Sequence, residues 1–139
     1  MRLNGKGITI RVHYNRLYSI FEKYEHIFHL PKATKYSDPS WFAFPLTIRD
    51  GVYMKRNDFT MYLEDCKIQT RNYFGGNILL QPAYEGIYSG DAKKDFPVAT
   101  KVTTDTFFLG TSPIITDEQL DYIELKVNDY FSQADNIRV

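Results

Sequence analysis

A shortage of metal-binding and redox-active side chains limits what this sequence can do. It has a single cysteine, Cys66, which can form neither an internal disulfide nor a cysteine cluster for zinc or iron and sulfur. The three histidines, His13, His26 and His29, are too scattered to form a metal site together with a carboxylate. We therefore expect no bound metal and no disulfide framework, and the lone thiol suits the reducing cytoplasm.

An excess of charge and a long apolar run are also absent. The 17 Lys plus Arg residues balance 17 Asp plus Glu residues, so the formal net charge is zero. Such a chain produces no long-range field that would attract nucleic acid or an anionic membrane. No apolar stretch approaches the roughly 18 residues that span a bilayer, and residues 1–10 contain no apolar core of a signal peptide. We expect neither nucleic acid nor a membrane as a partner.

Apolar residues are abundant enough for a core. They make up 43% of the chain, and 16% of all residues are aromatic. No repeat, low-complexity tract or Pro/Gly/Ser-rich linker divides the sequence. A chain of 139 residues therefore predicts one domain over residues 1–139.

Apolar periodicity predicts a helix and then a strand in the first third of the chain. After an irregular start, spacings of three and four residues indicate an amphipathic helix over about 11–29, ended by Pro31. Its apolar face consists of Leu17, Ile20, Phe21, Tyr24, Ile27 and Phe28. Alternation over 41–48 predicts a strand, in which Pro45 lacks a donor and indicates an edge position or a bulge.

The remaining elements complete an α+β pattern. Asn57 or Asp58 can cap a second helix, whose apolar face holds Phe59, Tyr62, Leu63 and Cys66. Short strands are predicted over 68–71 and 107–109, on either side of a glycine-bearing loop. Thr116 and Gln119 form a capping box that opens a last helix, which buries Leu120, Ile123, Val127 and Tyr130 or Phe131. The predicted fold is a small, mainly antiparallel sheet with helices packed on one face.

Polar residues with binding chemistry gather in one segment, 71–81. Arg71 carries a planar fork of donors suited to a phosphate or carboxylate, and Asn77 and Gln81 can each donate and accept with sugar hydroxyls. Gly75 and Gly76 let the backbone turn sharply and bring its amides near a ligand. Taken alone, such a glycine pair is usually an ordinary turn, and such polar groups are usually solvated.

Three segments carry a family resemblance. They are LPKATKYSDPSWFAFPLTI at 30–48, KIQTRNYFGGNILLQPAY at 67–84 and TDTFFLGTSPIITDEQLDYI at 104–123. Together they resemble the C-terminal domain of the DegT/DnrJ/EryC1/StrS aminotransferase family, and more narrowly its branch of nucleotide-linked 4-keto-6-deoxyhexose 3-dehydrases. In two places the chain departs from the pattern: Phe108-Leu109-Gly110 replaces the usual Trp-Ile-Gly, and residues 1–10 do not resemble the helix that should precede the domain.

This resemblance implies the C-terminal small domain of a fold-type I pyridoxal-phosphate enzyme, with the large cofactor-binding domain absent from residues 1–139. No catalytic residue and no cofactor site are then expected in this chain, and pyridoxal or pyridoxamine phosphate is implied only for the complete enzyme. The same resemblance places the 71–81 segment at the active-site cleft. The substrate-binding residues that we expect are Arg71, Phe74, Gly75, Gly76, Asn77 and Gln81.

The implied activity belongs to the complete enzyme, and the chain alone is expected to be inactive. That activity is removal of the 3-hydroxyl from a nucleotide-linked sugar, or transfer of an amino group to it, in deoxysugar or lipopolysaccharide O-antigen biosynthesis. The sequence FGGN at 74–77 favours the dehydrase. A homodimer, or association with a large domain, is the expected assembly. The alternative is a non-catalytic relic or an interaction module that complements a separately encoded large domain.

Overall fold

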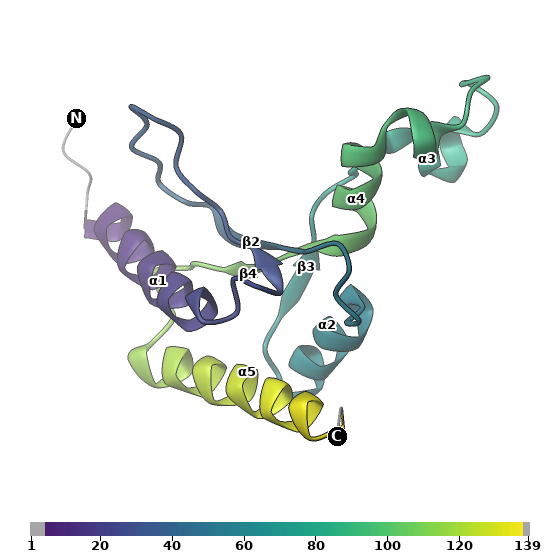
Figure 1. Cartoon of the computed structure of the whole chain (residues 1–139). Helices are drawn as coiled ribbons and strands as arrows, with labels where there is room; N and C mark the ends of the chain where they lie inside the picture. Colours follow the sequence, from purple (N-terminus) through teal and green to yellow (C-terminus); the bar gives the residue numbers. More distant parts are fainter. Residues whose placement is uncertain (1–4, 138–139) are drawn as a thin grey trace.

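The computed structural model describes residues 5–137 and shows an α+β fold (Figure 1). Its elements are α1 (Gly5–Glu22), β1 (Phe28–His29), β2 (Ala43–Ile48), α2 (Arg56–Asp65), β3 (Thr70–Asn72), the short 3-10 turns η1 (Ile78–Leu80) and η2 (Pro82–Tyr84), α3 (Ala92–Asp95), α4 (Pro97–Asp105), β4 (Thr106–Gly110) and α5 (Asp117–Ile137). The strands form one antiparallel sheet in the order β1-β2-β4-β3.

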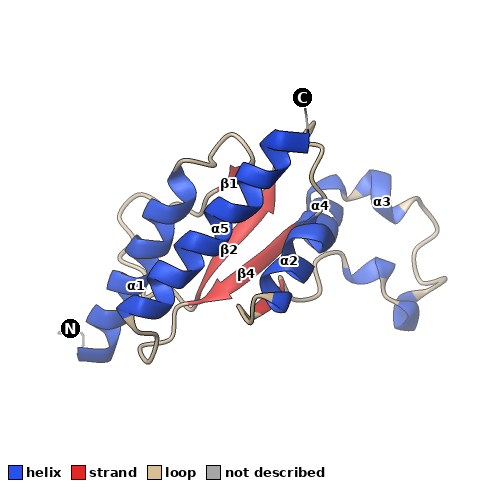
Figure 2. Ribbon diagram, turned by 90° about the horizontal axis from the view of Figure 1, so that it is seen from below, coloured by secondary structure: helices blue, strands red, loops and turns tan. Residues whose placement is uncertain are grey.

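Helices α1, α2 and α5 cover one face of this sheet (Figure 2). Segment 73–105, which includes α3 and α4, projects away from that layer (Figure 1). The predicted class, a small antiparallel sheet with helices on one face, is confirmed. No helix within residues 5–137 is long and apolar enough to cross a membrane.

Alternation along the two central strands directs their apolar side chains toward the helices. Phe44, Leu46 and Ile48 of β2 are buried, as are Phe107 and Leu109 of β4. From the helices, the buried side chains that meet them are Leu17, Ile20, Phe21, Phe59, Leu63, Leu120, Val127 and Phe131. The period of two in the strands and the period near four in the helices therefore produce one continuous core.

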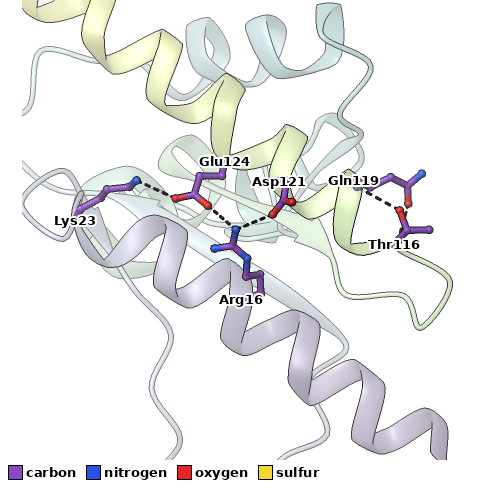
Figure 3. A network of polar contacts seen from close by, with 6 residues as sticks. All are labelled: Arg16, Lys23, Thr116, Gln119, Asp121 and Glu124. Atoms are coloured by element: carbon purple, nitrogen blue, oxygen red, sulfur yellow. Dashed lines mark hydrogen bonds and ion pairs between the residues drawn. The ribbon is translucent and has the colours of Figure 1, made fainter.

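Helix α5 begins as the sequence predicted. The backbone N–H of Thr116 donates to Oε1 of Gln119 at 3.0 Å, and the N–H of Gln119 donates to Oγ1 of Thr116 at 3.3 Å (Figure 3). This reciprocal capping box satisfies two of the N–H groups that a helix start leaves unpaired. The predicted buried positions, Leu120, Ile123 and Val127, are confirmed.

Ion pairs join α1 to α5 along their solvent side. The Arg16 guanidinium lies 2.9 Å from Asp121 and 2.6 Å from Glu124, and Lys23 lies 3.3 Å from the other Glu124 oxygen (Figure 3). The hydrogen bond from Arg16 lowers the pKa of Glu124 from its ordinary value. The network ties the first and last helices of the domain together at an exposed seam.

The first helix differs from its prediction. It begins at Gly5, within the stretch expected to be irregular, and ends at Glu22 rather than near residue 29. Turns follow, in which the N–H of Tyr24 donates to the Phe21 carbonyl, and Phe28 and His29 then pair with β2. The apolar residues at 24, 27 and 28 keep a helical spacing, but pairing with β2 ends the helix.

The start of α2 is a second correction. Its N-cap is Lys55, which makes no side-chain capping bond, so the predicted caps Asn57 and Asp58 lie inside the first turn. The Asn57 side chain instead accepts from the Arg56 guanidinium at 3.2 Å. The predicted apolar face is correct, because Phe59 and Leu63 are buried.

The edge position or bulge predicted for Pro45 is not formed, because β2 lies between β1 and β4 and pairs with β4 in continuous register. Its neighbour β1, however, is too short to reach Pro45. Strand β1 pairs only with Thr47 and Ile48, whereas β4 pairs with β2 along its length from Ala43 to Thr47. At Pro45 the strand therefore has a partner only on the β4 side. The N–H of Arg49 donates to the Ile27 carbonyl on the β1 side, and every second residue of a strand directs its N–H to the same side. Residue 45 therefore faces the side without a partner, and the missing N–H of proline costs no ladder hydrogen bond.

Candidate functional site

The face of the sheet opposite the helices presents a cation beside an aromatic ring. Arg71 of β3 is directly opposite Phe108 of β4 in the antiparallel register. Directly opposite residues in such a pair project on the same face. Since the neighbouring β4 residues Phe107 and Leu109 are buried toward the helices, Arg71 and Phe108 project on the other face.

Four aromatic residues gather around this point, and we call Phe42, Tyr73, Phe74 and Phe108 the aromatic patch. Ring centroids lie 6.0 Å apart for Phe42 and Phe108, 5.9 Å for Phe74 and Phe108, and 6.4 Å for the stacked pair Phe42 and Phe74. Phe42 is 77% exposed and Phe74 is 71% exposed. A contiguous aromatic surface of this kind is typical of a binding face.

An open pocket of about 640 Å³ lies against the aromatic patch. Its walls include the side chains of Trp41, Phe42, Arg71, Phe74 and Phe108. Arg71 is the only charged residue among the described residues that line the pocket, and no carboxylate lies among them. The pocket therefore combines flat apolar surfaces with one unopposed cation, which suits an anionic ligand that carries a ring.

The structure brings together only part of the segment predicted as the substrate site. Arg71 and Phe74 both line the pocket. Gly75 and Gln81 are exposed, and the Gln81 amide nitrogen lies 3.2 Å from where a Cβ on Gly75 would stand, so they are neighbours beside the pocket rather than in its wall. Gly76 turns toward α4, where a Cβ would lie 2.1 Å from the Thr103 hydroxyl oxygen.

The expected placement of Asn77 is wrong. We expected its polar end to share a concave surface with Arg71, but Asn77 is only 4% exposed. Its amide nitrogen donates to the Ala92 carbonyl at 2.9 Å and to Thr100 Oγ1 at 3.1 Å, and its Oδ1 accepts from the Leu79 N–H. The side chain caps η1 and clamps this turn to α3 and α4, so its hydrogen-bonding groups are used inside the domain.

The sequence did not identify the aromatic residues of the pocket that come from outside segment 71–81. Trp41 and Phe42 lie just before β2, and Phe108 lies in β4. The signal for Phe108 was present, because alternation in Phe107-Phe108-Leu109 places the middle ring on the face opposite its neighbours. Phe42 had no such signal: alternation with Phe44 would bury it, yet the chain bends at residue 42 and the ring is exposed.

The three pockets described within residues 5–137 do not fit pyridoxal phosphate. That cofactor needs donors for its phosphate, an acid near its ring nitrogen and, where it forms a Schiff base with the enzyme, a lysine amine. Among the described residues, the 640 Å³ pocket has Arg71 but no lysine, while a 440 Å³ pocket with Lys67 and a 530 Å³ pocket with Lys32 have no acid in their walls. The described residues also contain no cluster of three or more metal-ligating side chains.

Comparison with known proteins identifies relatives over most of this chain. Residues 8–128 match the DegT/DnrJ/EryC1/StrS aminotransferase family. The lipopolysaccharide biosynthesis protein RfbH of Salmonella typhimurium is 34% identical over 102 residues, covering 73% of this chain and 23% of that protein. The dTDP-4-dehydro-2,6-dideoxy-D-glucose 3-dehydratase of Saccharopolyspora spinosa is 38% identical over 106 residues, covering 76% of this chain and 22% of that protein.

A solved structure shows the same fold. The GDP-4-keto-6-deoxy-D-mannose-3-dehydratase of E. coli, determined with bound hydrated PLP, superposes with a TM-score of 0.71 at 18% sequence identity. The match covers 86% of this chain and 30% of that one. The chain thus spans between a fifth and a third of the length of these relatives.

Proposed function

Because the chain belongs to the DegT/DnrJ/EryC1/StrS aminotransferase family, we propose that residues 1–139 are the C-terminal small domain of a nucleotide-sugar 3-dehydrase or sugar aminotransferase. The complete enzyme serves deoxysugar or lipopolysaccharide biosynthesis. The names of the two curated relatives support this pathway class, and the dehydratase from Saccharopolyspora spinosa supports the dehydrase branch. In this proposal the domain helps to form the substrate cleft and does not carry the chemistry alone.

The observation that carries the proposal is the position of Arg71 beside the aromatic patch on the open face of the sheet. A nucleotide-linked sugar has a pyrophosphate, which matches a guanidinium fork, and a base and a hexose ring that can stack on aromatic side chains. Arg71 would bind the charged part of the substrate. Phe42, Phe74 and Phe108 would exclude water and orient the rings.

The same face supports association with another domain or subunit. Phe42 and Phe74 leave most of their surface exposed within the described residues, and an apolar surface of this kind is stabilised when a partner covers it. We propose that a large domain provides the opposite wall of the pocket, and that pyridoxal or pyridoxamine phosphate is held there. A homodimer of the complete enzyme is compatible with this arrangement.

A domain graft tests the proposal. Residues 1–139 replace the corresponding small domain of an active relative, and Arg71→Ala is introduced into the graft. Loss of a charge-assisted contact should lower kcat/KM about ten- to a hundredfold, equivalent to about 1.5–3 kcal/mol. The matched control is Lys55→Ala, which removes an exposed cation that lies outside the pocket.

The outcomes separate the proposed role from a passive one. A selective loss in Arg71→Ala supports a role in the cleft. If the graft is active and both Arg71→Ala and Phe74→Ala keep the parent kinetics, the segment does not bind substrate. The domain would then act as a non-catalytic module that only completes the assembly.

A further inference from the structure

Gly76 and helix α4 are in unusually close contact. Gly76 has a φ of 53°, and a Cβ at this position would lie 2.1 Å from Thr103 Oγ1 and 2.8 Å from the Thr103 Cα. Only glycine permits this approach without separating the loop from the helix. The reason for glycine at residue 76 is therefore backbone packing against α4.

Thr103 connects three parts of the domain. Its hydroxyl accepts from the N–H of Asn77 at 2.6 Å and donates to the Ala99 carbonyl at 3.0 Å. The Arg56 guanidinium, at the start of α2, donates to the Thr103 carbonyl at 2.6 Å. Thr103 thus links the end of the glycine loop to α4 and, through Arg56, to the helical layer.

The loop between Asn72 and Asn77 is held at both ends and carries Phe74, which lines the pocket. At one end, Asn72 of β3 pairs with Phe107 of β4; at the other, Asn77 is held by Thr103 and Thr100. Between them, Phe74 has a φ of 48° and its ring is 71% exposed. The ring packs against Phe42, Tyr73 and Phe108 at the surface, and the anchored ends of the loop set the backbone position from which it reaches them.

We infer that Thr103 is a positioning residue for the substrate pocket: its hydroxyl anchors the loop that presents Phe74. This inference rests on the proposed function, because it assigns Thr103 to the same pocket. It makes α4, which contributes no lining residue to the 640 Å³ pocket, part of the substrate-binding apparatus. Thr103 acts through the loop and touches no substrate.

The first test needs only the 139-residue chain. Thr103→Val keeps the shape of the side chain and removes the hydroxyl, so backbone hydrogen exchange over residues 73–77 should rise about three- to tenfold, as expected for one lost hydrogen bond. Exchange in β2 and α5 should stay unchanged, and Thr103→Ser should restore the parent rate. Thr104→Val is the matched control, because the exposed Thr104 hydroxyl bonds only to carbonyls of its own helix. Unchanged exchange at 73–77, or an equal rise throughout the chain, would overturn the inference.

The second test uses the graft and a double-mutant cycle between Thr103→Val and Phe74→Ala. If Thr103 acts through Phe74, Thr103→Val should raise KM severalfold with a smaller effect on kcat, and should have little further effect once Phe74 is alanine. Additive effects would refute the positioning role even if exchange rises. If Phe74→Ala and Arg71→Ala both leave the kinetics of the graft unchanged, the proposed function of the pocket fails and the positioning role fails with it. If only Phe74→Ala leaves them unchanged, the positioning role alone fails. If Phe74→Ala weakens the graft but Thr103→Val does not, only the inference about Thr103 fails.

Discussion

Replacing Phe59 with alanine removes a ring that the structure buries completely. Its centroid lies 5.7 Å from that of Phe28, 5.8 Å from Phe107, 5.4 Å from Phe131 and 4.8 Å from Tyr130. These neighbours come from α5, β4 and the short strand β1, so Phe59 joins α2 to three other elements. No single neighbour can move into the space without leaving another contact.

The expected cost is large relative to the stability of a domain of this size. A fully buried Phe→Ala change removes apolar surface and leaves a cavity, and typically costs about 3–5 kcal/mol. Total unfolding free energies of single domains are about 5–15 kcal/mol. Phe74→Ala is the matched control: it removes the same atoms from a ring that is 71% exposed and should cost less than about 1 kcal/mol.

Urea denaturation, followed by circular dichroism and by fluorescence of the single tryptophan, Trp41, measures both variants. With a slope of about 2 kcal/mol per molar urea, the Phe59→Ala midpoint should fall by roughly 2 M, and that of Phe74→Ala by less than about 0.5 M. Equal slopes would show that the comparison reports stability. A Phe59→Ala cost below about 1.5 kcal/mol, or no greater than that of Phe74→Ala, would refute the packing derived for the core.

Three further predictions use the same denaturation assay. Gly76→Ala should lower the unfolding free energy by more than about 2 kcal/mol, because the new Cβ meets α4 and the residue has a positive φ. Gly51→Ala, with a φ of 78° and open space around it, should lower it by about 1 kcal/mol from backbone strain alone. Equal losses would contradict the contact with α4. Thr116→Ala should cost about 1 kcal/mol by removing the α5 cap, and no loss would count against the capping box. Arg16 lowers the pKa of Glu124 below its ordinary value of 4.5, so the stability from this pair should be fully present above about pH 4.5 and disappear as the pH falls through the lower folded pKa. Between pH 7 and pH 3, the unfolding free energy of Arg16→Ala should therefore fall less steeply than that of the parent. An identical fall in both proteins would exclude the pair as a source of stability.

Elements whose signals are local could be predicted from the sequence. The start of α5 depends on Thr116 and Gln119, three residues apart, and the structure forms both of the predicted bonds. The buried face of α2 follows from the four-residue spacing of Phe59 and Leu63. In each case the information lies within one or two helical turns, where propensity and spacing act directly.

Elements that depend on distant contacts could not be predicted in this way. Helix α1 ends early because Phe28 and His29 pair with residues about twenty positions later in the chain. Helix α4 buries none of its residues, and its contacts with the glycine loop, such as that of Thr103 with Asn77, join residues 26 positions apart. The side chain of Asn77 is buried by Ala92 and Thr100, which only the tertiary fold brings to it. A polar residue in a glycine loop has the same sequence signature whether it faces a ligand or clamps a turn.

Because β4 is the last strand in the chain but a central strand of the sheet, the sheet can close only late in synthesis. Strands β2 and β3 do not pair with each other; each pairs with β4, which is the last strand in the chain. While the chain is being synthesised, everything before Thr106 can form helices and the short β1–β2 pair but cannot close the sheet. Until β4 emerges, Phe44 and Leu46 of β2 have no strand beside them, and their apolar surface is open to other chains. A chain truncated just before residue 106 would therefore be prone to aggregation, and β4 together with α5 completes the sheet and its core.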